Sequence, residues 1–421
     1  MREKLIICGK LFDCIHDDLQ EKMEILIEGN VIKEVGKNLS YSSGAEVIDL
    51  SELTVTPGMI DAHVHTDILD WREYWQNIPL RSDAFYTLSH LHTAMRSLER
   101  GFTTVRAHSA APSDYGIADV KKMINRGAFA GARLNITCHL LGTPGSHCDN
   151  GQSLAGNPNY ALRTQSPHIG SGADFFRNAV RNEVKFGSDF IKLFLSGGFS
   201  TPNDGPEDQQ MCDEEIEAVI STARALRKPT TAHVYAPHLM QKLIHYGITG
   251  MEHGALMDEE TARMFEETDT YLVPTFCPYD DVIAGDEASL KKKTPEFREK
   301  LIHYGKWLKE GRKIIIDSKI RLGYGTDLVA VDQCYEGWRE YQSWMDSGME
   351  PFRILKAATS VNAEILQMNR YIGTIESGKY ADIAGWHRDL LTDPKALSQC
   401  DFVMKDGIVY PTVYAEKEIE E

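Results

Sequence analysis

The feature that most constrains the fold of this chain is a repeated alternation of short apolar runs with stretches of helical spacing. Residues 213–226 and 295–318, for example, carry helical spacing with no proline in their interior. Parallel strands need a crossover connection, which is usually a helix, so strands that alternate with helices pair in parallel. The apolar runs number eight and lie at 58–66, 102–108, 134–141, 190–196, 230–235, 248–254, 271–277 and 321–327. The alternation therefore predicts an α/β fold built on a (β/α)₈ TIM barrel.

Both ends of the chain are rich in strand-like segments. Residues 23–28 and 31–35 flank a Gly-Asn pair, which is the pattern of a β-hairpin. Short apolar segments recur towards the other end, at 380–384, 402–404 and 408–410. We expect the two ends to pair, so that residues 1–56 and 369–421 form one small β-sandwich domain beside a barrel of residues 57–368.

Composition limits the classes of partner and the compartment. The 45 basic and 62 acidic residues give a net charge of −17, which argues against nucleic acid or an anionic membrane as a partner. No apolar run approaches the roughly 20 residues that span a bilayer, and the apolar stretch at 5–8 is too short for a signal-peptide core. The eight cysteines contain no C-x-x-C pair, which indicates reduced thiols. We expect a cytoplasmic homo-oligomer that acts on a small molecule.

Two histidines stand at the end of the first apolar run. His63 and His65 are separated by one residue, and alternate residues of a strand share a face, so both imidazoles are expected to point into the barrel mouth. Such a pair alone is weak evidence for a metal site. A second signal is Lys192, which apolar residues flank on both sides, because a buried ammonium is costly unless its charge is removed or used.

Further metal-binding residue types stand at the ends of other runs. His233, His253 and Asp327 each come at or near the carboxyl end of a different predicted strand. Barrel active sites are assembled at these strand ends. Four histidines, one lysine and one aspartate in this register predict a metal-dependent hydrolase, against the alternative of a polar barrel rim without a ligand.

Six motifs together carry a family resemblance. They lie at 57–65 (PGMIDAHVH), 191–198 (IKLFLSGG), 233–237 (HVYAP), 252–254 (EHG), 325–327 (GTD) and 373–382 (GTIESGKYAD). In this combination the chain resembles the amidohydrolase superfamily, and within it the prolidase-like branch of Xaa-Pro dipeptidases, N-acyl amino acid carboxypeptidases and ochratoxin-type amidases. The resemblance covers nearly the whole chain.

The resemblance implies a binuclear metal centre. By analogy, Lys192 would be carbamylated and would bridge two divalent ions, most readily zinc, although the same ligands suit manganese, cobalt or iron. One ion would be held by His63, His65 and Asp327. The other would be held by His233 and His253.

The expected mechanism is attack on an amide carbonyl by a hydroxide that bridges the two metals. Asp327 would orient this hydroxide and then carry its proton to the leaving nitrogen. The resemblance implies that Tyr235 donates a hydrogen bond to the developing oxyanion and contacts the substrate, although a packing role for this aromatic stays open. Deamination is disfavoured, because Ala236 stands where deaminase relatives place a glutamate, and those relatives also lack the lysine.

The substrate is predicted to be a dipeptide or an N-acyl amino acid. Candidates for holding its α-carboxylate are Arg106, at the end of the second run, and His147, in the glycine-rich loop after the third run. His108 and His139 are possible pocket residues or buried structural residues, and the lysines at 291–293 are expected to form a solvated face. Two alternatives stay open: a cyclic-amide hydrolase of the hydantoinase or lactamase type, and a metal-free scaffold protein of the same fold, which should lack ligands that are present here.

Overall fold

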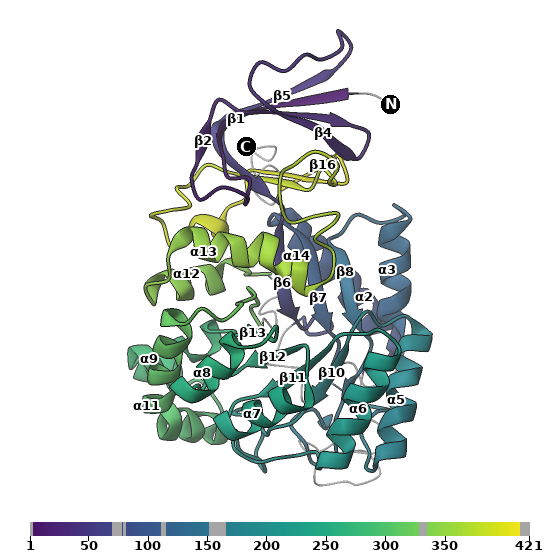
Figure 1. Ribbon diagram of the computed structural model, residues 1–421, viewed down its shortest axis with the longest axis vertical. Coiled ribbons are helices and arrows are strands. Elements are labelled where there is room, and N and C mark those ends of the chain that lie inside the picture. The colour runs from purple at the N-terminus through teal and green to yellow at the C-terminus, as the bar shows by residue number, and fades with distance from the viewer. Residues whose placement is uncertain are drawn as a thin grey trace.

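The computed structural model describes residues 3–69, 78, 81–110, 115–150, 166–327 and 335–412, and every structural statement below concerns these residues. Figure 1 shows two parts: a β-rich part that contains strands from both ends of the chain, and an α/β part in which helices surround parallel strands. No helix in these ranges is both long enough and apolar enough to cross a membrane.

The β-rich part is one sheet of eight strands. Its strands are β1 (Glu3–Leu11), β2 (Gln20–Glu21), β3 (Glu24–Glu28), β4 (Val31–Gly36), β5 (Glu46–Pro57), β14 (Ile383–Trp386), β15 (Phe402–Lys405) and β16 (Ile408–Tyr410). The order is β16-β15-β14-β5-β1-β3-β4, with β2 paired to β1. The predicted hairpin is present as the antiparallel pair β3–β4, which turns at Gly29 with a φ of 68°.

Strands from the two ends of the chain are joined in this sheet by β5 and β14. These strands pair antiparallel, with Ile383 opposite Pro57 and Trp386 opposite Thr54. The predicted pairing of the two ends is therefore present. The domain boundaries at 56/57 and 368/369, and a second sheet facing the first, stay predictions.

The α/β part contains two parallel sheets. The first has the order β6-β7-β8 and the second β13-β12-β11-β10-β9. Their strands are β6 (Met59–Val64), β7 (Phe102–His108), β8 (Arg133–Thr137), β9 (Leu140–Leu141), β10 (Ile191–Phe194), β11 (Thr230–Val234), β12 (Gly250–His253) and β13 (Tyr271–Val273). Every pairing within the two sheets is parallel, as the alternation with helices predicts.

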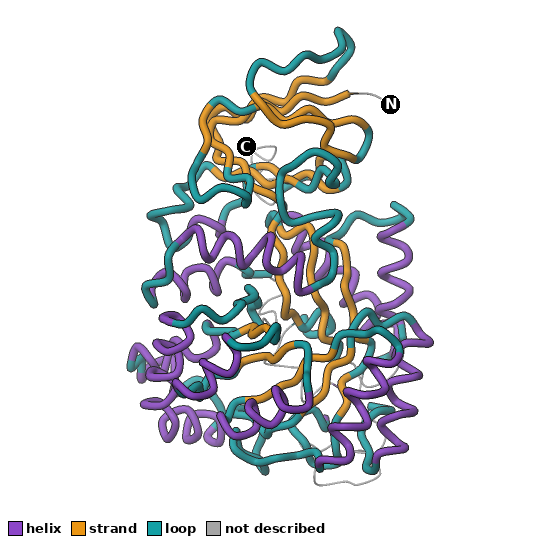
Figure 2. Tube along the Cα trace, viewed as in Figure 1, coloured by secondary structure: helices purple, strands orange, loops and turns teal. Residues whose placement is uncertain are grey.

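Helices lie on the outside of these strands (Figure 2). They are α2 (Asp83–Glu99), α3 (Gly116–Asn125), α5 (Ala173–Phe186), α6 (Asp213–Ala225), α7 (Pro237–Tyr246), α8 (Glu259–Glu266), α9 (Asp280–Ala284), α10 (Glu287–Leu290), α11 (Pro295–Asp317), α12 (Trp338–Asp346), α13 (Pro351–Lys356) and α14 (Asn362–Ile365). The two helices predicted at 213–226 and 295–318 are present as α6 and α11. The main hydrophobic core fills the layer between helices and strands, where α5 buries Phe176 and Val180 beside Leu193 of β10. Burying each such side chain stabilises the fold by roughly 1.5–3 kcal/mol.

The predicted third strand, 134–141, is divided into β8 and β9. The amides of Cys138 and His139 donate to Oε2 of Glu183 at 2.9 and 3.1 Å. A carboxylate on α5 therefore takes the place of a neighbouring strand as the acceptor for these two amides, and the strand is interrupted where it binds. β8 then pairs with β7, and β9 pairs with β10.

The predicted eighth run, 321–327, is extended but forms only an isolated bridge, Leu322 with Leu272. On one side, the amide of Gly323 donates to the carbonyl of Leu272 at 2.8 Å. On the other side, the amide of Ala62 donates to the carbonyl of Tyr324 at 2.8 Å. This segment therefore lies between β13 and β6, and it carries Asp327 to the end of β6.

Candidate active site

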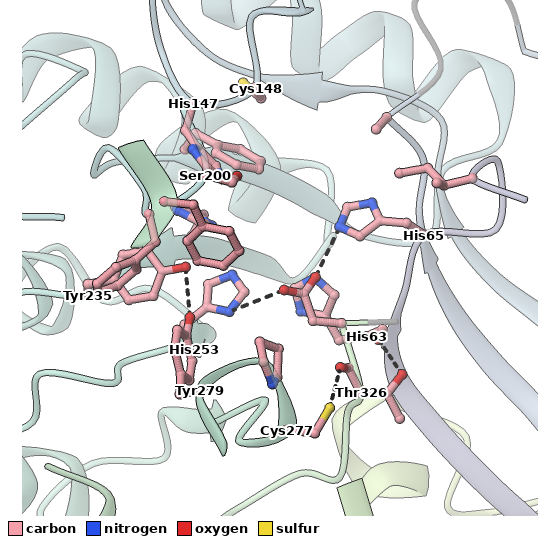
Figure 3. A pocket seen from close by; sticks show the side chains of 18 of the residues that line it. His63, His65, His147, Cys148, Ser200, Tyr235, His253, Cys277, Tyr279 and Thr326 are labelled. Atoms are coloured by element: carbon pink, nitrogen blue, oxygen red, sulfur yellow. Dashed lines mark hydrogen bonds and ion pairs between the residues drawn. The ribbon is translucent and has the colours of Figure 1, made fainter. Parts of the chain in front are cut away.

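The predicted metal ligands converge at one end of the parallel strands. They come from β6, β10, β11, β12 and the segment 321–327. A cavity of about 370 Å³ opens there, and His63, His65, His233, His253 and Asp327 are in its wall (Figure 3). Lys192 of β10 is in the same cluster but is only 1% exposed. The strand register that the sequence indicates therefore brings all six side chains together.

Three of these side chains form a compact group. Nε2 of His63 and Nε2 of His65 each lie 3.2 Å from Oδ1 of Asp327. Burial would raise the pKa of Asp327, but the imidazoles of His63 and His65 hold it well below the ordinary value. Asp327 is therefore an ionised carboxylate between two imidazole nitrogens, which is a ligand set suited to a divalent metal.

Two of the candidate ligands have a strained backbone. His253 has a φ of 70° and Asp327 a φ of 50°, both in the left-handed region that side chains other than glycine rarely adopt. Backbone strain of this kind costs about 1–3 kcal/mol per residue and is concentrated at functional sites. Hydrogen bonds support both positions: Nδ1 of His253 lies 2.8 Å from Oγ1 of Thr275, and the amide of Asp327 donates to the carbonyl of His63 at 2.8 Å.

A buried carboxylate behind the cavity orients His63. Oε2 of Glu252 lies 2.8 Å from Nδ1 of His63. The other oxygen, Oε1, accepts hydrogen bonds from Arg106 at 2.7 Å and from Thr231 at 2.5 Å. Burial would raise the pKa of Glu252, but the guanidinium of Arg106 and the ammonium of Lys192 hold it well below its ordinary value. Since Nδ1 of His63 donates to this carboxylate, Nε2 is the ring nitrogen that faces Asp327.

Several polar atoms in the cluster have no partner among the described residues. They are Nζ of Lys192, Nε2 of His233 and Nδ1 of His65, all buried. Burial also lowers the pKa of Lys192 to about 8, so this amine loses its proton more readily than a solvated lysine does. Leaving a buried polar group unsatisfied costs about 1–3 kcal/mol. Such atoms, next to an ionised carboxylate, fit a centre that binds cations.

Tyr235 lies over the imidazoles of the second pair of predicted ligands. Its ring centroid is 5.1 Å from that of His253 and 4.9 Å from that of His233. Its hydroxyl accepts a hydrogen bond from the hydroxyl of Tyr279 at 2.9 Å. Burial raises the pKa of Tyr235 above its ordinary value, so the phenol keeps its proton. Since Tyr279 donates to it, the proton of Tyr235 is available for a group in the cavity.

The two predicted carboxylate-binding residues lie in different places. His147 is in the cavity wall, and its ring stacks on that of His233 at 4.6 Å. Arg106 is 1% exposed and does not line this cavity; its charge is paired with Glu252. This position does not support the prediction that Arg106 holds the substrate, which stays a prediction. The side chain points inward as expected, but it lies two residues before the end of β7, below the floor of the cavity.

His108 and His139, which the sequence left as either pocket residues or buried structural residues, are buried structural residues. The His108 ring stacks on that of His63 at 3.9 Å, and the His139 Nδ1 lies 2.9 Å from Oε1 of Glu183. Both histidines are fully buried, and neither lines the cavity.

The rest of the cavity wall combines apolar and charged side chains. Its apolar members include Ile68, Leu140, Phe194, Phe199 and Phe297. Its charged members form two pairs, Lys293 with Asp281 at 2.9 Å and Arg339 with Glu336 at 2.7 Å. Lys293 was expected on a solvated face, but its side chain is only 19% exposed and reaches the cavity.

The sequence analysis did not predict the role of Glu252 or the two charged pairs in the cavity wall. For Glu252 a signal was present, because an acid in an apolar run directly before a predicted ligand must be paired when it is buried. For Lys293 and Asp281 no signal was present, since helical surface charges of this kind are usually solvated.

Comparisons with known proteins found proteins similar to this one over most of its length. Ochratoxinase from Aspergillus niger is 24% identical over 365 residues, which cover 82% of this chain and 72% of that protein. The structure of a Xaa-Pro dipeptidase with bound methionine in its active site superposes with a TM-score of 0.84 and 26% identity, covering 97% of this chain and 100% of that one. A prolidase complexed with N-methylphosphonate-L-proline gives a TM-score of 0.83 and 25% identity, again over 97% and 100% of the two chains.

The family model that matches the chain is that of the amidohydrolase family, over residues 54–416. This range includes all six residues of the cluster and the cavity around them. The chain therefore belongs to the amidohydrolase family and is a metal-dependent hydrolase of C–N bonds.

Proposed function

We propose that this protein is a binuclear metal-dependent amidohydrolase that cleaves the amide bond of a dipeptide or an N-acyl amino acid. The observation that carries the proposal is the convergence of four histidines, Lys192 and Asp327 at one cavity, with Nζ of Lys192 buried and unpartnered among the described residues. We also propose that the two parallel sheets and the segment 321–327 together form a closed (β/α)₈ barrel, which would explain this convergence.

The residues of the cluster suit two ions. His63, His65 and Asp327 would hold one, His233 and His253 would hold the other, and carbamylated Lys192 would be shared between them. Zinc is the ion that imidazole and carboxylate ligands favour most often in hydrolases. When bound, such a pair of ions lowers the pKa of water and polarises a carbonyl group.

The side chains of the chain would then carry the proton and orient the substrate. Asp327 is ionised and faces the cavity, so it can accept the proton that the attacking water loses and pass it to the leaving nitrogen. Tyr235 has a proton free to donate and can hydrogen-bond the carbonyl oxygen as negative charge develops there. Glu252 and Arg106 keep His63 in one tautomer and one orientation.

The cavity wall supports a substrate with a sizeable apolar group. Phe194, Phe199 and Phe297 are in that wall, and His147 adds a polar contact beside them. The similarity to a Xaa-Pro dipeptidase, a prolidase and ochratoxinase supports an amide whose leaving side is an amino acid.

The test is a metal analysis combined with a hydrolysis screen. The zinc-loaded enzyme would be offered dipeptides, N-acyl amino acids, the same compounds with an amidated C-terminus, and cyclic amides. We expect about two metal ions per chain and hydrolysis of the free acids. Amidation should lower kcat/KM by about tenfold or more, because a charge-assisted hydrogen bond contributes roughly 1.5–3 kcal/mol. Equal cleavage of acids and amides, or cleavage of cyclic amides alone, would replace this proposal with the cyclic-amide alternative.

A further inference from the structure

The loop that follows β10 is tied to α11 by one lysine. Nζ of Lys300 donates to the carbonyl of Gly198 at 2.8 Å and to the carbonyl of Thr201 at 2.6 Å, and it also contacts the carbonyl of Asp204. The loop is therefore held on the cavity side of the barrel, next to His147, rather than being a free connection.

Four side chains of this region form a closed ring of hydrogen bonds. Nδ1 of His147 lies 2.8 Å from Oγ1 of Thr201, and that hydroxyl donates to Oδ1 of Asp204. Oδ2 of Asp204 accepts from Nε2 of Gln210 at 2.9 Å. Oε1 of Gln210 accepts from the backbone amide of His147 at 3.0 Å, which closes the ring. Thr201 is 1% and Asp204 9% exposed, so the ring is largely shielded from water.

The direction of these hydrogen bonds fixes one nitrogen of His147. A hydroxyl has a single proton, and that of Thr201 is donated to the carboxylate of Asp204. The oxygen of Thr201 must therefore accept, so Nδ1 of His147 is the donor. Nε2 is then the unprotonated ring nitrogen of a side chain that lines the cavity.

The imidazole plane is fixed as well. The ring stacks on His233 at 4.6 Å and on Phe194 at 5.9 Å. On another side it rests on the backbone of Gly198, where an added Cβ would lie 2.1 Å from Cε1 of His147. The second glycine of the Ser-Gly-Gly motif after β10 is therefore required for space, because any side chain at 198 would displace the ring.

We infer that Thr201 and Asp204 are positioning residues that, with the space left by Gly198, direct the unprotonated Nε2 of His147 at a hydrogen-bond donor on the leaving side of the substrate. In this tautomer Nε2 accepts a hydrogen bond and does not donate one to a carboxylate. The inference deepens the proposed function and rests on it for the reaction. His147 makes the contact with the substrate, and Thr201 and Asp204 act only through His147.

The kinetic test compares Thr201→Val, which removes the hydroxyl at nearly constant volume, with Thr201→Ser, which keeps the hydroxyl. On the best substrate of the hydrolysis screen we expect Thr201→Val to raise KM by about tenfold with kcat within about threefold, the pattern of a lost binding contact. Thr201→Ser should stay within about threefold of the wild type in both constants. Metal content and thermal unfolding are measured in the same samples, and Gly198→Ala should reproduce the rise in KM.

A second readout does not need turnover. Imidazole ¹⁵N NMR of the zinc-loaded enzyme reports which ring nitrogen carries the proton, and the His147 signals are assigned by their loss in His147→Gln. We expect the His147 ring to be protonated at Nδ1 in the wild type and in Thr201→Ser. In Thr201→Val we expect the proton to be distributed differently between Nδ1 and Nε2. An unchanged ring in Thr201→Val overturns the positioning role, and a changed ring with unchanged KM overturns the contact with the substrate. If the screen finds no substrate, the proposed function fails while the NMR comparison still decides the positioning.

Discussion

Glu252 and His63 form a fully buried carboxylate–imidazole pair, with 2.8 Å between Oε2 of Glu252 and Nδ1 of His63. The same carboxylate accepts from Arg106, so an arginine that never reaches the cavity acts on the site through two successive hydrogen bonds. A buried charge that loses its partner is costly, and a metal-binding imidazole that loses its orienting carboxylate binds metal less well. Arg106, Glu252 and His63 therefore link the stability of the fold to the affinity of the site.

The first prediction concerns Arg106→Met, which keeps most of the bulk of the side chain and removes the guanidinium partner of the buried Glu252 carboxylate. We expect the free energy of unfolding to fall by about 3–5 kcal/mol. Metal affinity should fall as well, because Glu252 no longer holds His63 in place. The measurements are denaturant unfolding and metal titration with a competing chelator.

Arg133→Met is the matched control for this variant. Arg133 is also buried and pairs with Asp382 at 2.6 Å, but it lies beside the terminal sheet. It should destabilise the fold without changing metal affinity in the folded protein. If Arg106→Met instead kept normal metal affinity and lost the discrimination between free-acid and amidated substrates, Arg106 would contact the substrate after all.

The second prediction concerns Lys192→Ala. The variant removes the residue that we propose is carbamylated and shared between two ions, so metal binding should weaken by more than the roughly 10–100-fold that the loss of an outer partner costs. Activity should fall in proportion to the metal lost. Lys405→Ala is the control, because Lys405 is also buried but donates to the carbonyl of Gly131 at 2.7 Å, and neither of these residues lines the cavity. Two bound metals and near-normal turnover in Lys192→Ala would show that the lysine is not a ligand.

The third prediction concerns acid stability and Glu183. Burial would raise the pKa of Glu183, but hydrogen bonds from His139 and His168 lower it to about 2. A depressed folded-state pKa adds stability that is fully present above the unfolded value of 4.5 and is lost as the pH falls towards 2. Glu183→Gln should therefore be less stable than the wild type at pH 7 by about 3 kcal/mol.

The difference between the two proteins should shrink as the pH is lowered below 4.5. Unfolding in denaturant at pH 7, 5 and about 3.5 measures this difference. A difference that stays constant over the whole range would mean that Glu183 acts by packing alone and not by its charge.

How far the sequence predicted this site depended on the period of the strands. His63 and His65 were expected on one face because alternate residues of a strand share a face. Lys192 was singled out by its apolar flanks, and His233 and His253 by their places at the carboxyl ends of predicted strands. The alternation of side chains gives the face of the strand on which a residue lies, but not how far along the strand it lies from the cavity. Arg106 and His108 point the same way on β7, yet one step of two residues is nearly 7 Å along a strand, and this step separates the two side chains in depth.

Contacts between segments distant in the sequence could not be predicted for a different reason. Glu252 lies 189 residues after His63, and Asp204 meets His147 through a loop whose shape is set by Lys300. Such pairings depend on three-dimensional packing and leave no periodic signal. The split of the third strand has the same origin, because the acceptor for its two amides is a side chain on α5.

The last prediction concerns Asp327→Asn. The amide keeps the shape of the side chain and one oxygen that can act as a ligand, but it cannot accept the proton of the attacking water. We expect turnover to fall by roughly 10²–10⁴, which is the usual contribution of a positioned acid–base group. Because Oδ1 of Asp327 lies 3.2 Å from both His63 and His65, metal occupancy must be measured in the same samples. Turnover should therefore be expressed per fully loaded site, after reconstitution with excess zinc. Full loading with unchanged turnover would exclude Asp327 as the proton carrier, and the fall should be absent in Asp204→Asn, whose effect is expected in KM.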